Sequence, residues 1–152
     1  MAAYTLYWKK ETVDRYIDEK RTDLSAGLSG QFLARGVQRG DWIYPLQVRE
    51  GRLGLICALR IAAITPNSDS PDPRDYWKEM AIAAEGTATP MRFDGFLSDE
   101  AVRRVEFESD SSRSLLISEG RVSWHCLRAM RKMTPDTQRL FDEHLRRIGS
   151  CS

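Results

Sequence analysis

The part of this sequence that most constrains its fold is a β-hairpin signal in the first half of the chain. Residues 42–48 are rich in aromatic and branched side chains, and the turn sequence Glu-Gly-Arg follows at residues 50–52. A long, mostly apolar run returns over residues 53–64, which is typical of a strand covered on both faces. Pro45 lacks an amide donor, so we expect the first strand to lie at a sheet edge or to bulge there. The sequence therefore predicts a sheet built around this hairpin.

Two further elements and a loop are expected before the hairpin. Residues 4–8 are aromatic and β-branched and predict an opening strand. Apolar side chains at helical spacing over residues 13–17 predict a short amphipathic helix. Residues 24–40 contain four glycines and are expected to be mostly loop, with Phe32 and Leu33 turned inward.

The second half of the chain alternates loops with helix signals. Residues 74–85 fit a helix, although residues 80–84 fit a strand as well. Ser98 is the expected N-cap of a short helix, and residues 122–133 carry apolar side chains at helical spacing. A last helix is predicted over residues 134–149, with proline at its first position and glycine at its end. Its buried stripe is expected to be Leu140, Phe141, Leu145 and Ile148.

Length and composition indicate a single globular domain. The chain has 152 residues, of which 41% are hydrophobic and 30% are charged, as in ordinary folded proteins. We expect one domain over residues 1–149 and a tail over residues 150–152. No run of about 18 apolar residues exists, so we expect no membrane-spanning helix and no membrane partner. The amino terminus lacks the charge order of a secretion signal, which favours a cytoplasmic location.

Motifs for metal binding, cofactor binding and catalysis are missing from the sequence. The three cysteines lie far apart without a CxxC pair, and only two histidines exist, so no metal site is expected. No Walker A, GxGxxG, GxSxG or HExxH pattern occurs. A Ser-His-Asp triad would have to use His125 or His144, and His144 lies beside the apolar stripe, which favours a structural role. We therefore expect a binding protein without cofactor or catalytic residues rather than an enzyme.

Aromatic residues next to cations are the strongest functional signal. Tryptophan and tyrosine offer flat faces on which a nucleic-acid base can stack, at about 1–3 kcal/mol per base. Trp42 and Tyr44 are two positions apart in the predicted strand and so share one face, and Trp8 directly precedes Lys9. The alternative is that these rings belong to the hydrophobic core, Trp124 above all.

The carboxyl-terminal third is more basic than the rest of the chain, whose net charge is +1. Between residues 113 and 147 there are eight Lys or Arg against four Asp or Glu. Arg128, Arg131 and Lys132 stand at i, i+3 and i+4 of the predicted helix and so share one face. This face is a candidate for phosphate contacts that fix position without reading sequence, or else an ordinary solvated face.

Four segments, in their order along the chain, resemble one known superfamily. They are YTLYWKK at residues 4–10, RGDWIYPLQV at 39–48, LGLICALRI at 53–61 and MTPDT at 133–137. This order is similar to that of PUA-like domains, in particular the EVE and YTH-related branch, over residues 4–145. The resemblance implies an α+β fold in which a small, strongly bent β-barrel is flanked by helices.

The same resemblance implies that the domain binds RNA or modified DNA and receives one flipped base in an aromatic-lined pocket. RNA or DNA would then be its partner, with an effector protein as a further partner. The candidate pocket residues are Trp8, Lys9, Ser29, Gln31, Phe32, Trp42, Tyr44 and Trp77.

An enzyme is one alternative, because ASCH domains resemble this architecture too. Some of them deaminate or deacylate modified nucleosides with a lysine, a threonine and a glutamate. Lys9 and Thr12 stand at spacing three, and Glu79 or Glu85 would supply the acid. Such chemistry needs a desolvated lysine.

A protein-interaction module is the other alternative. It is favoured if Tyr76, Trp77 and Met80 form an exposed apolar patch.

Overall fold

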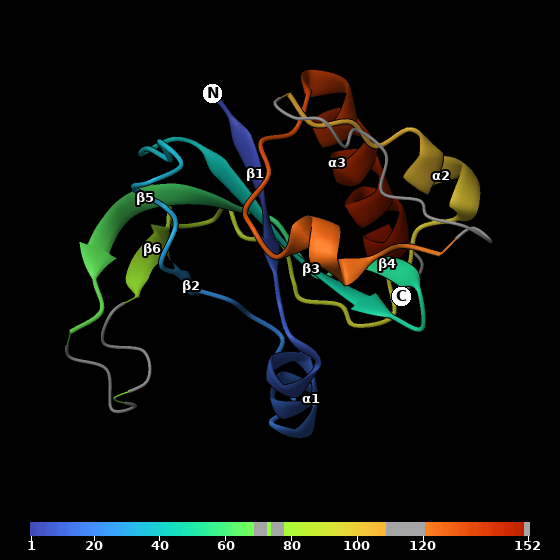
Figure 1. The fold of residues 1–152 in the computed structure, drawn as a ribbon. Coiled ribbons are helices and arrows are strands. Elements are labelled where there is room, and N and C mark those ends of the chain that lie inside the picture. The colour runs from blue at the N-terminus through green and yellow to red at the C-terminus, as the bar shows by residue number, and fades with distance from the viewer. Residues whose placement is uncertain (69–72, 74–77, 109–120, 151–152) are drawn as a thin grey trace.

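Six strands in one bent sheet form the centre of the molecule, and helices pack against it (Figure 1). The computed structural model of the chain describes residues 1–68, 73, 78–108 and 121–150, apart from the side chains of Trp124 and Ser150. The strands are β1 (Ala3–Tyr7), β2 (Ala26–Ser29), β3 (Trp42–Arg49), β4 (Arg52–Leu55), β5 (Leu59–Pro66) and β6 (Glu79–Ala83). The helices are α1 (Lys10–Asp18), α2 (Asp99–Arg103), the 3-10 helix η3 (Trp124–Leu127) and α3 (Pro135–Ser150). No described helix is long and apolar enough to cross a membrane.

The sheet is curled without being a closed barrel. Its strand order is β1-β3-β5-β6-β2, and β4 pairs with β3 as the second arm of a hairpin. β1 runs parallel to β3, and the other pairs are antiparallel. Among the described residues the end strands β1 and β2 do not pair, although a Cβ on Gly27 would lie only 3.0 Å from Leu6 Cδ2. The α+β class is as predicted, whereas the sheet stays open where a barrel would close.

The hairpin forms as predicted, but its return strand is shorter. Glu50 and Gly51 have φ values of 54° and 76°, the left-handed geometry of a two-residue hairpin turn. The run 53–64, predicted to be one strand, divides into β4 and β5 around residues 56–58. Residues 53–59 are all buried, in agreement with the expected cover on both faces.

Pro45 accounts for this division. It lies between the part of β3 that pairs with β5 and the part that pairs with β4. Leu46 O accepts from Trp8 N on the β1 side, so even-numbered residues of β3 bond with β1 and odd-numbered residues face β4 and β5. Pro45 has no N–H to donate toward β4 and β5, and β3 changes from β5 to β4 as its partner at this residue. The carbonyl oxygen of Pro45 still accepts a hydrogen bond from Ile56 N at 3.0 Å. β3 is not an edge strand, because it has neighbours on both sides, but its register against the return strand shifts by one residue at Pro45, as in a bulge.

Two predictions outside the hairpin need correction. The glycine-rich segment 24–40 is mostly loop as predicted, but it contains the short strand β2, and Leu33 is 67% exposed rather than inward, although Phe32 is fully buried. Over residues 79–83 the predicted helix is wrong and the alternative strand is correct, since β6 pairs with β5 and with β2. Both strands form because distant segments accept and donate their backbone hydrogen bonds, which overrides a weak local preference.

The helix predicted over residues 122–133 is wrong beyond one short turn. Only η3 forms, and residues 131–133 then run antiparallel beside β1. Thr5 N donates to Arg131 O at 2.9 Å, and Arg131 N donates to Thr5 Oγ1 at the same distance. This segment covers an edge of β1 that would otherwise expose unpaired backbone groups.

The helices α2 and α3 begin as predicted. Ser98 Oγ accepts from Ala101 N at 3.2 Å, and Thr134 Oγ1 accepts from Thr137 N at 3.2 Å. α3 continues one residue past Gly149. Its predicted stripe faces the core, with Ile148 partly buried and with three members buried, namely Leu140, Phe141 and Leu145.

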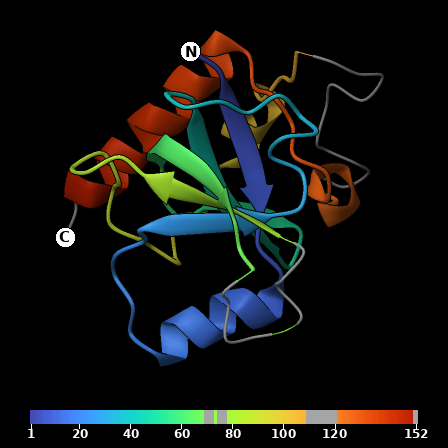
Figure 2. The same cartoon turned by 90° about the vertical axis from the view of Figure 1, so that its left-hand side faces the viewer.

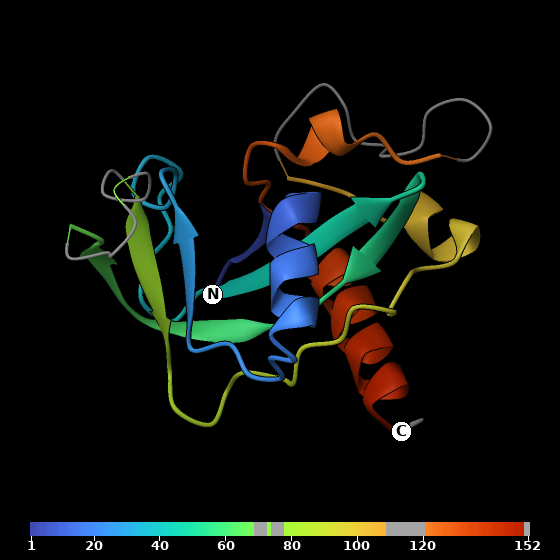
Figure 3. The same cartoon turned by 90° about the horizontal axis from the view of Figure 1, so that it is seen from below.

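The sheet separates two hydrophobic cores. One lies between β3 and α3 and contains Tyr44 and Phe141. The other lies inside the curl of the sheet and against α1, and it contains Trp8, Val13 and Phe32. α1 and α3 accordingly lie on opposite faces of β3 (Figures 2 and 3). Because successive residues of a strand point to opposite faces, neighbouring side chains of β3 enter different cores.

Asp41 binds the backbone near the amino terminus to the start of β3, and we expect its replacement to lower the free energy of unfolding. Its carboxylate accepts from Ala2 N at 3.0 Å and from Gln38 N at 2.9 Å. Asp41→Ala should lower the free energy of unfolding by about 2 kcal/mol, because two donors lose a charged acceptor. A urea titration followed by circular dichroism measures the change. Asp41→Asn keeps one acceptor oxygen and should lose about half as much; equal losses would contradict the two-bond arrangement.

Candidate nucleic-acid interface

The sheet separates the aromatic residues that the sequence groups into one base pocket. Trp42 and Tyr44 face α3, whereas Trp8 and Phe32 belong to the core on the opposite face. Trp77 lies outside the described residues. These rings therefore do not line one common pocket in the described part of the chain, and each face has its own chemistry.

On the α3 face, Tyr44 is fully buried and holds β3 to α3. Its hydroxyl donates to Asp142 Oδ1 at 2.5 Å and accepts from Gln138 Nε2 at 3.2 Å. Burial raises the pKa of Tyr44 far above its ordinary value of 10.0, and burial also raises the pKa of the Asp142 carboxyl. Trp42 lies 6.5 Å away between ring centroids and is only half-buried. Tyr44 is thus a core residue, and of the two rings Trp42 alone reaches the surface.

Five of the predicted pocket residues lie at the ends of β1 and β2 or directly after them. We call this group the β1–β2 seam, and it consists of Trp8, Lys9, Ser29, Gln31 and Phe32. Ser29 Oγ accepts from Gln31 N at 3.0 Å. Gln31 Oε1 accepts from Met130 N at 2.9 Å, which joins the β2 side of the seam to the segment that runs beside β1. Trp8 and Phe32 are buried beneath these groups, and Lys9 is exposed.

Cations and a helix end lie near Trp8, on the β1 side of the seam. Lys9 and Lys10 are exposed at the start of α1, and the N-cap residue Lys9 makes no side-chain cap, so among the described residues the first N–H groups of α1 can accept an anion as partner. Tyr16 packs edge-on against Trp8, with ring centroids 4.8 Å apart. The guanidinium of Arg21 lies 4.4 Å from the centroid of the Tyr16 ring. Aromatic rings beside cations are the kind of surface that binds single-stranded nucleic acid.

The basic triplet predicted on one helical face does not form, because its segment is not helical. Arg131 is buried, with its guanidinium 4.4 Å from the centroid of the Phe107 ring. Lys132 Nζ lies 3.2 Å from Glu108 Oε2, and the hydrogen bond to Glu108 raises the pKa of Lys132. Arg128 and Lys132 are exposed, and a phosphate contact from either one stays a prediction.

The two alternative sites receive little support. Lys9 is exposed, whereas the enzyme alternative needs a desolvated lysine. Glu79 Oε1 accepts a backbone N–H at 3.0 Å and so already has a structural role. For the interaction-module alternative, Met80 is half-buried, and Tyr76 and Trp77 lie outside the described residues.

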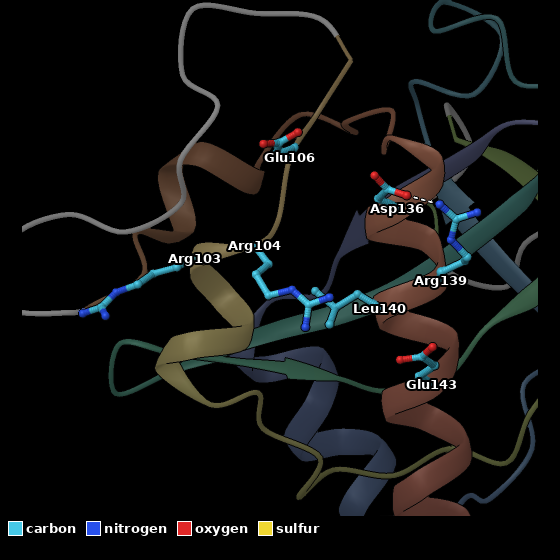
Figure 4. Close-up of a pocket in the computed structure, with 7 residues that line it drawn as sticks. All are labelled: Arg103, Arg104, Glu106, Asp136, Arg139, Leu140 and Glu143. Atoms are coloured by element: carbon cyan, nitrogen blue, oxygen red, sulfur yellow. Dashed lines mark hydrogen bonds and ion pairs between the residues drawn. The ribbon is translucent and has the colours of Figure 1, made fainter.

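A charged cavity between α2 and α3 has no counterpart among the sequence motifs. We call it the α2–α3 hollow; its volume is about 460 Å³ (Figure 4). It is lined by Arg103, Arg104, Glu106, Asp136, Arg139, Leu140 and Glu143. The only signal for it in the sequence is that the last four stand at i, i+3, i+4 and i+7, which places them on one face of a helix.

No family model matches this chain, and no curated protein matches its sequence closely enough to count as a relative. Within residues 1–68, 73, 78–108 and 121–150, no three His, Cys, Asp or Glu side chains gather as metal ligands would. The function has to be argued from the residues and their geometry.

Proposed function

We propose that the protein is a PUA-like nucleic-acid-binding domain whose contact site is the β1–β2 seam. The observation that carries this proposal is that two distant segments, residues 8–9 and 29–32, share one buried cluster through Trp8 and Phe32, and that Gln31 joins the second segment to Met130. The two segments supply an aromatic ring, a lysine, a hydroxyl and an amide, which together stack on a base, fix a phosphate and recognise a base edge. Trp42 and Tyr44 have no part in this site.

The polar groups of the seam divide into two roles. Lys9 and Lys10 are exposed beside the uncapped start of α1 and would fix phosphates in position. Gln31 would read the base. Its Oε1 is engaged with Met130, but within the described residues nothing accepts from its Nε2, and amide donors of this kind bond to acceptors on base edges.

Entry of a base requires a small local movement. Trp8 is 7% exposed and Phe32 is fully buried, so the loop carrying Gln31 must move away from Met130 before a base can stack. Losing that hydrogen bond costs about 1 kcal/mol, whereas stacking contributes about 1–3 kcal/mol per base. This balance favours a base that is already unpaired, because a duplex adds the cost of unstacking and unpairing.

The salt dependence of binding tests the phosphate contacts. The double variant Lys9→Gln/Lys10→Gln should reduce the slope of log K against log salt by about 1.4, because each phosphate contact on a single strand contributes about 0.7. Fluorescence anisotropy at several salt concentrations measures the slope with one labelled oligonucleotide, made as RNA and as DNA. The same sequence in duplex form should bind more weakly.

A matched variant on the other side of the molecule serves as the control. Arg103→Gln/Arg104→Gln removes the same charge from α2, away from the seam (Figure 1), and should keep the slope of the wild type. An equal decrease in both double variants would indicate diffuse attraction. An unchanged slope in the lysine variant would exclude the seam as the phosphate contact.

A further inference from the structure

The α2–α3 hollow plays no part in the proposed function, and its volume of about 460 Å³ falls within the range of about 300–1,000 Å³ that is usual for small-molecule sites. The side of the hollow formed by α3 consists of residues 136, 139, 140 and 143, which share one face of the helix. On that side Asp136 and Arg139, one turn apart, form an ion pair with each other. Their charges are therefore already balanced, and the other groups decide what the hollow can bind.

Among the described residues, the other charged groups that line the hollow form no ion pair with one another. Arg104 points from the end of α2 toward Leu140 on α3, whereas Arg103 points away from α3 (Figure 4). In the part of the chain that the structure describes, no carboxylate lies within ion-pair distance of Arg104, and no cation lies within that distance of Glu106 or Glu143. One guanidinium and a facing carboxylate are thus left in the hollow, with an apolar side chain between them.

We propose that this hollow binds a small zwitterion of the α-amino-acid class. The ligand carboxylate would bind Arg104, its ammonium group Glu143, and a short apolar side chain would lie against Leu140. Leu140 and Glu143 are i, i+3 neighbours, with Cβ atoms about 5–6 Å apart. An amino acid carries its carboxylate, ammonium group and side chain on one carbon, so it presents three groups with this close spacing.

The charge balance of the lining argues against a phosphate-rich ligand. Three carboxylates line the same hollow as three guanidinium groups. A nucleic-acid backbone carries a negative charge at every phosphate with no cation to offset it, and it would place phosphates next to Glu106 and Glu143. A zwitterion satisfies both signs at once. This proposal is independent of the β1–β2 seam.

A titration with three related probes tests the proposal on the full-length chain. L-leucine carries both charges, N-acetyl-L-leucine lacks the ammonium group, and L-leucinamide lacks the carboxylate. In ¹⁵N-labelled protein, L-leucine should shift the amide signals of α2 and of the first half of α3, and it should bind about tenfold more tightly than either analogue. Equal binding of the three probes would overturn the proposal, and so would unchanged signals on both helices near the solubility limit of leucine.

Two variants and a matched control assign the charges. Arg104→Gln should weaken L-leucine about tenfold without weakening L-leucinamide, which has no carboxylate to bind there. Glu143→Gln should weaken L-leucine without weakening N-acetyl-L-leucine. Arg103→Gln removes the same charge from the neighbouring residue, but its side chain points away from α3 (Figure 4), so L-leucine should bind as in the wild type. A loss as large as that of Arg104→Gln would mean that only net charge matters, which would overturn the assignment.

Discussion

Replacing Tyr44 with alanine is expected to lower the free energy of unfolding by about 3–5 kcal/mol, the usual cost of truncating a buried aromatic residue. The side chain is fully buried, and its ring lies 5.8 Å from that of Phe141 between centroids. The same change removes the hydroxyl that Asp142 and Gln138 bind. A urea titration monitored by tryptophan fluorescence and circular dichroism measures the loss.

Two further variants separate the ring of Tyr44 from its hydroxyl and from its neighbour. Tyr44→Phe keeps the ring but leaves Asp142 and Gln138 without their partner, so a loss of about 1–3 kcal/mol is expected. Trp42→Ala removes a half-buried ring of the same strand face and should cost less than Tyr44→Ala. If Tyr44→Ala lowered the free energy of unfolding no more than Trp42→Ala, the result would contradict the full burial of Tyr44. Because Tyr44 is a core residue, weaker nucleic-acid binding by Tyr44→Ala would reflect the fraction of unfolded protein rather than a lost contact.

The elements that the sequence predicts well are those whose ends are fixed by nearby residues. The hairpin turn at Glu50 and Gly51 depends on two positive φ values. Ser98 and Thr134 each accept a hydrogen bond from an amide three residues further on. Such signals lie within a few residues of the structure that they specify, so they can be read without knowledge of the rest of the fold.

The elements that the sequence predicts wrongly are those in which a distant strand supplies the hydrogen bonds. Residues 79–83 fit a helix or a strand equally, and the position of β5 and β2 on either side decides for the strand. Residues 131–133 carry a helical pattern, yet the open edge of β1 takes them as a partner. Tertiary contacts outweigh propensities that amount to less than about 1 kcal/mol per residue.

The same distinction holds for the candidate sites. The spacing of Trp42 and Tyr44 correctly places both on one face of a strand. Which face α3 covers depends on contacts with the far end of the chain, so their burial could not be predicted. The hollow between α2 and α3 depends likewise on how two helices pack, and a spacing pattern on α3 alone does not reveal that Arg104 faces it.

A second large effect is expected at alkaline pH, and it begins with Cys57. This thiol is fully buried, and burial raises its pKa from 9.0 to about 12. Between these values the unfolded chain releases the proton while the folded chain keeps it, so the free energy of unfolding falls as pH rises. The contribution is complete below pH 9 and is lost by pH 12, a total of about 4 kcal/mol at about 1.4 kcal/mol per pKa unit. Above pH 10, Tyr44 adds to the loss, because burial raises its pKa as well.

The variant Cys57→Ala separates the thiol from the tyrosines. In urea titrations the Cys57 thiol should account for a loss of about 1 kcal/mol between about pH 9 and pH 10, and the tyrosines with raised pKa values begin to add to the loss near pH 10. Cys57→Ala loses some packing at every pH, but across this window it should lose about 1 kcal/mol less than the wild type. Cys126→Ala, which removes a half-buried thiol instead, should keep the decrease of the wild type. Parallel curves for the wild type and Cys57→Ala would contradict the buried thiol as the source, because the loss would then have to come from groups that both proteins share.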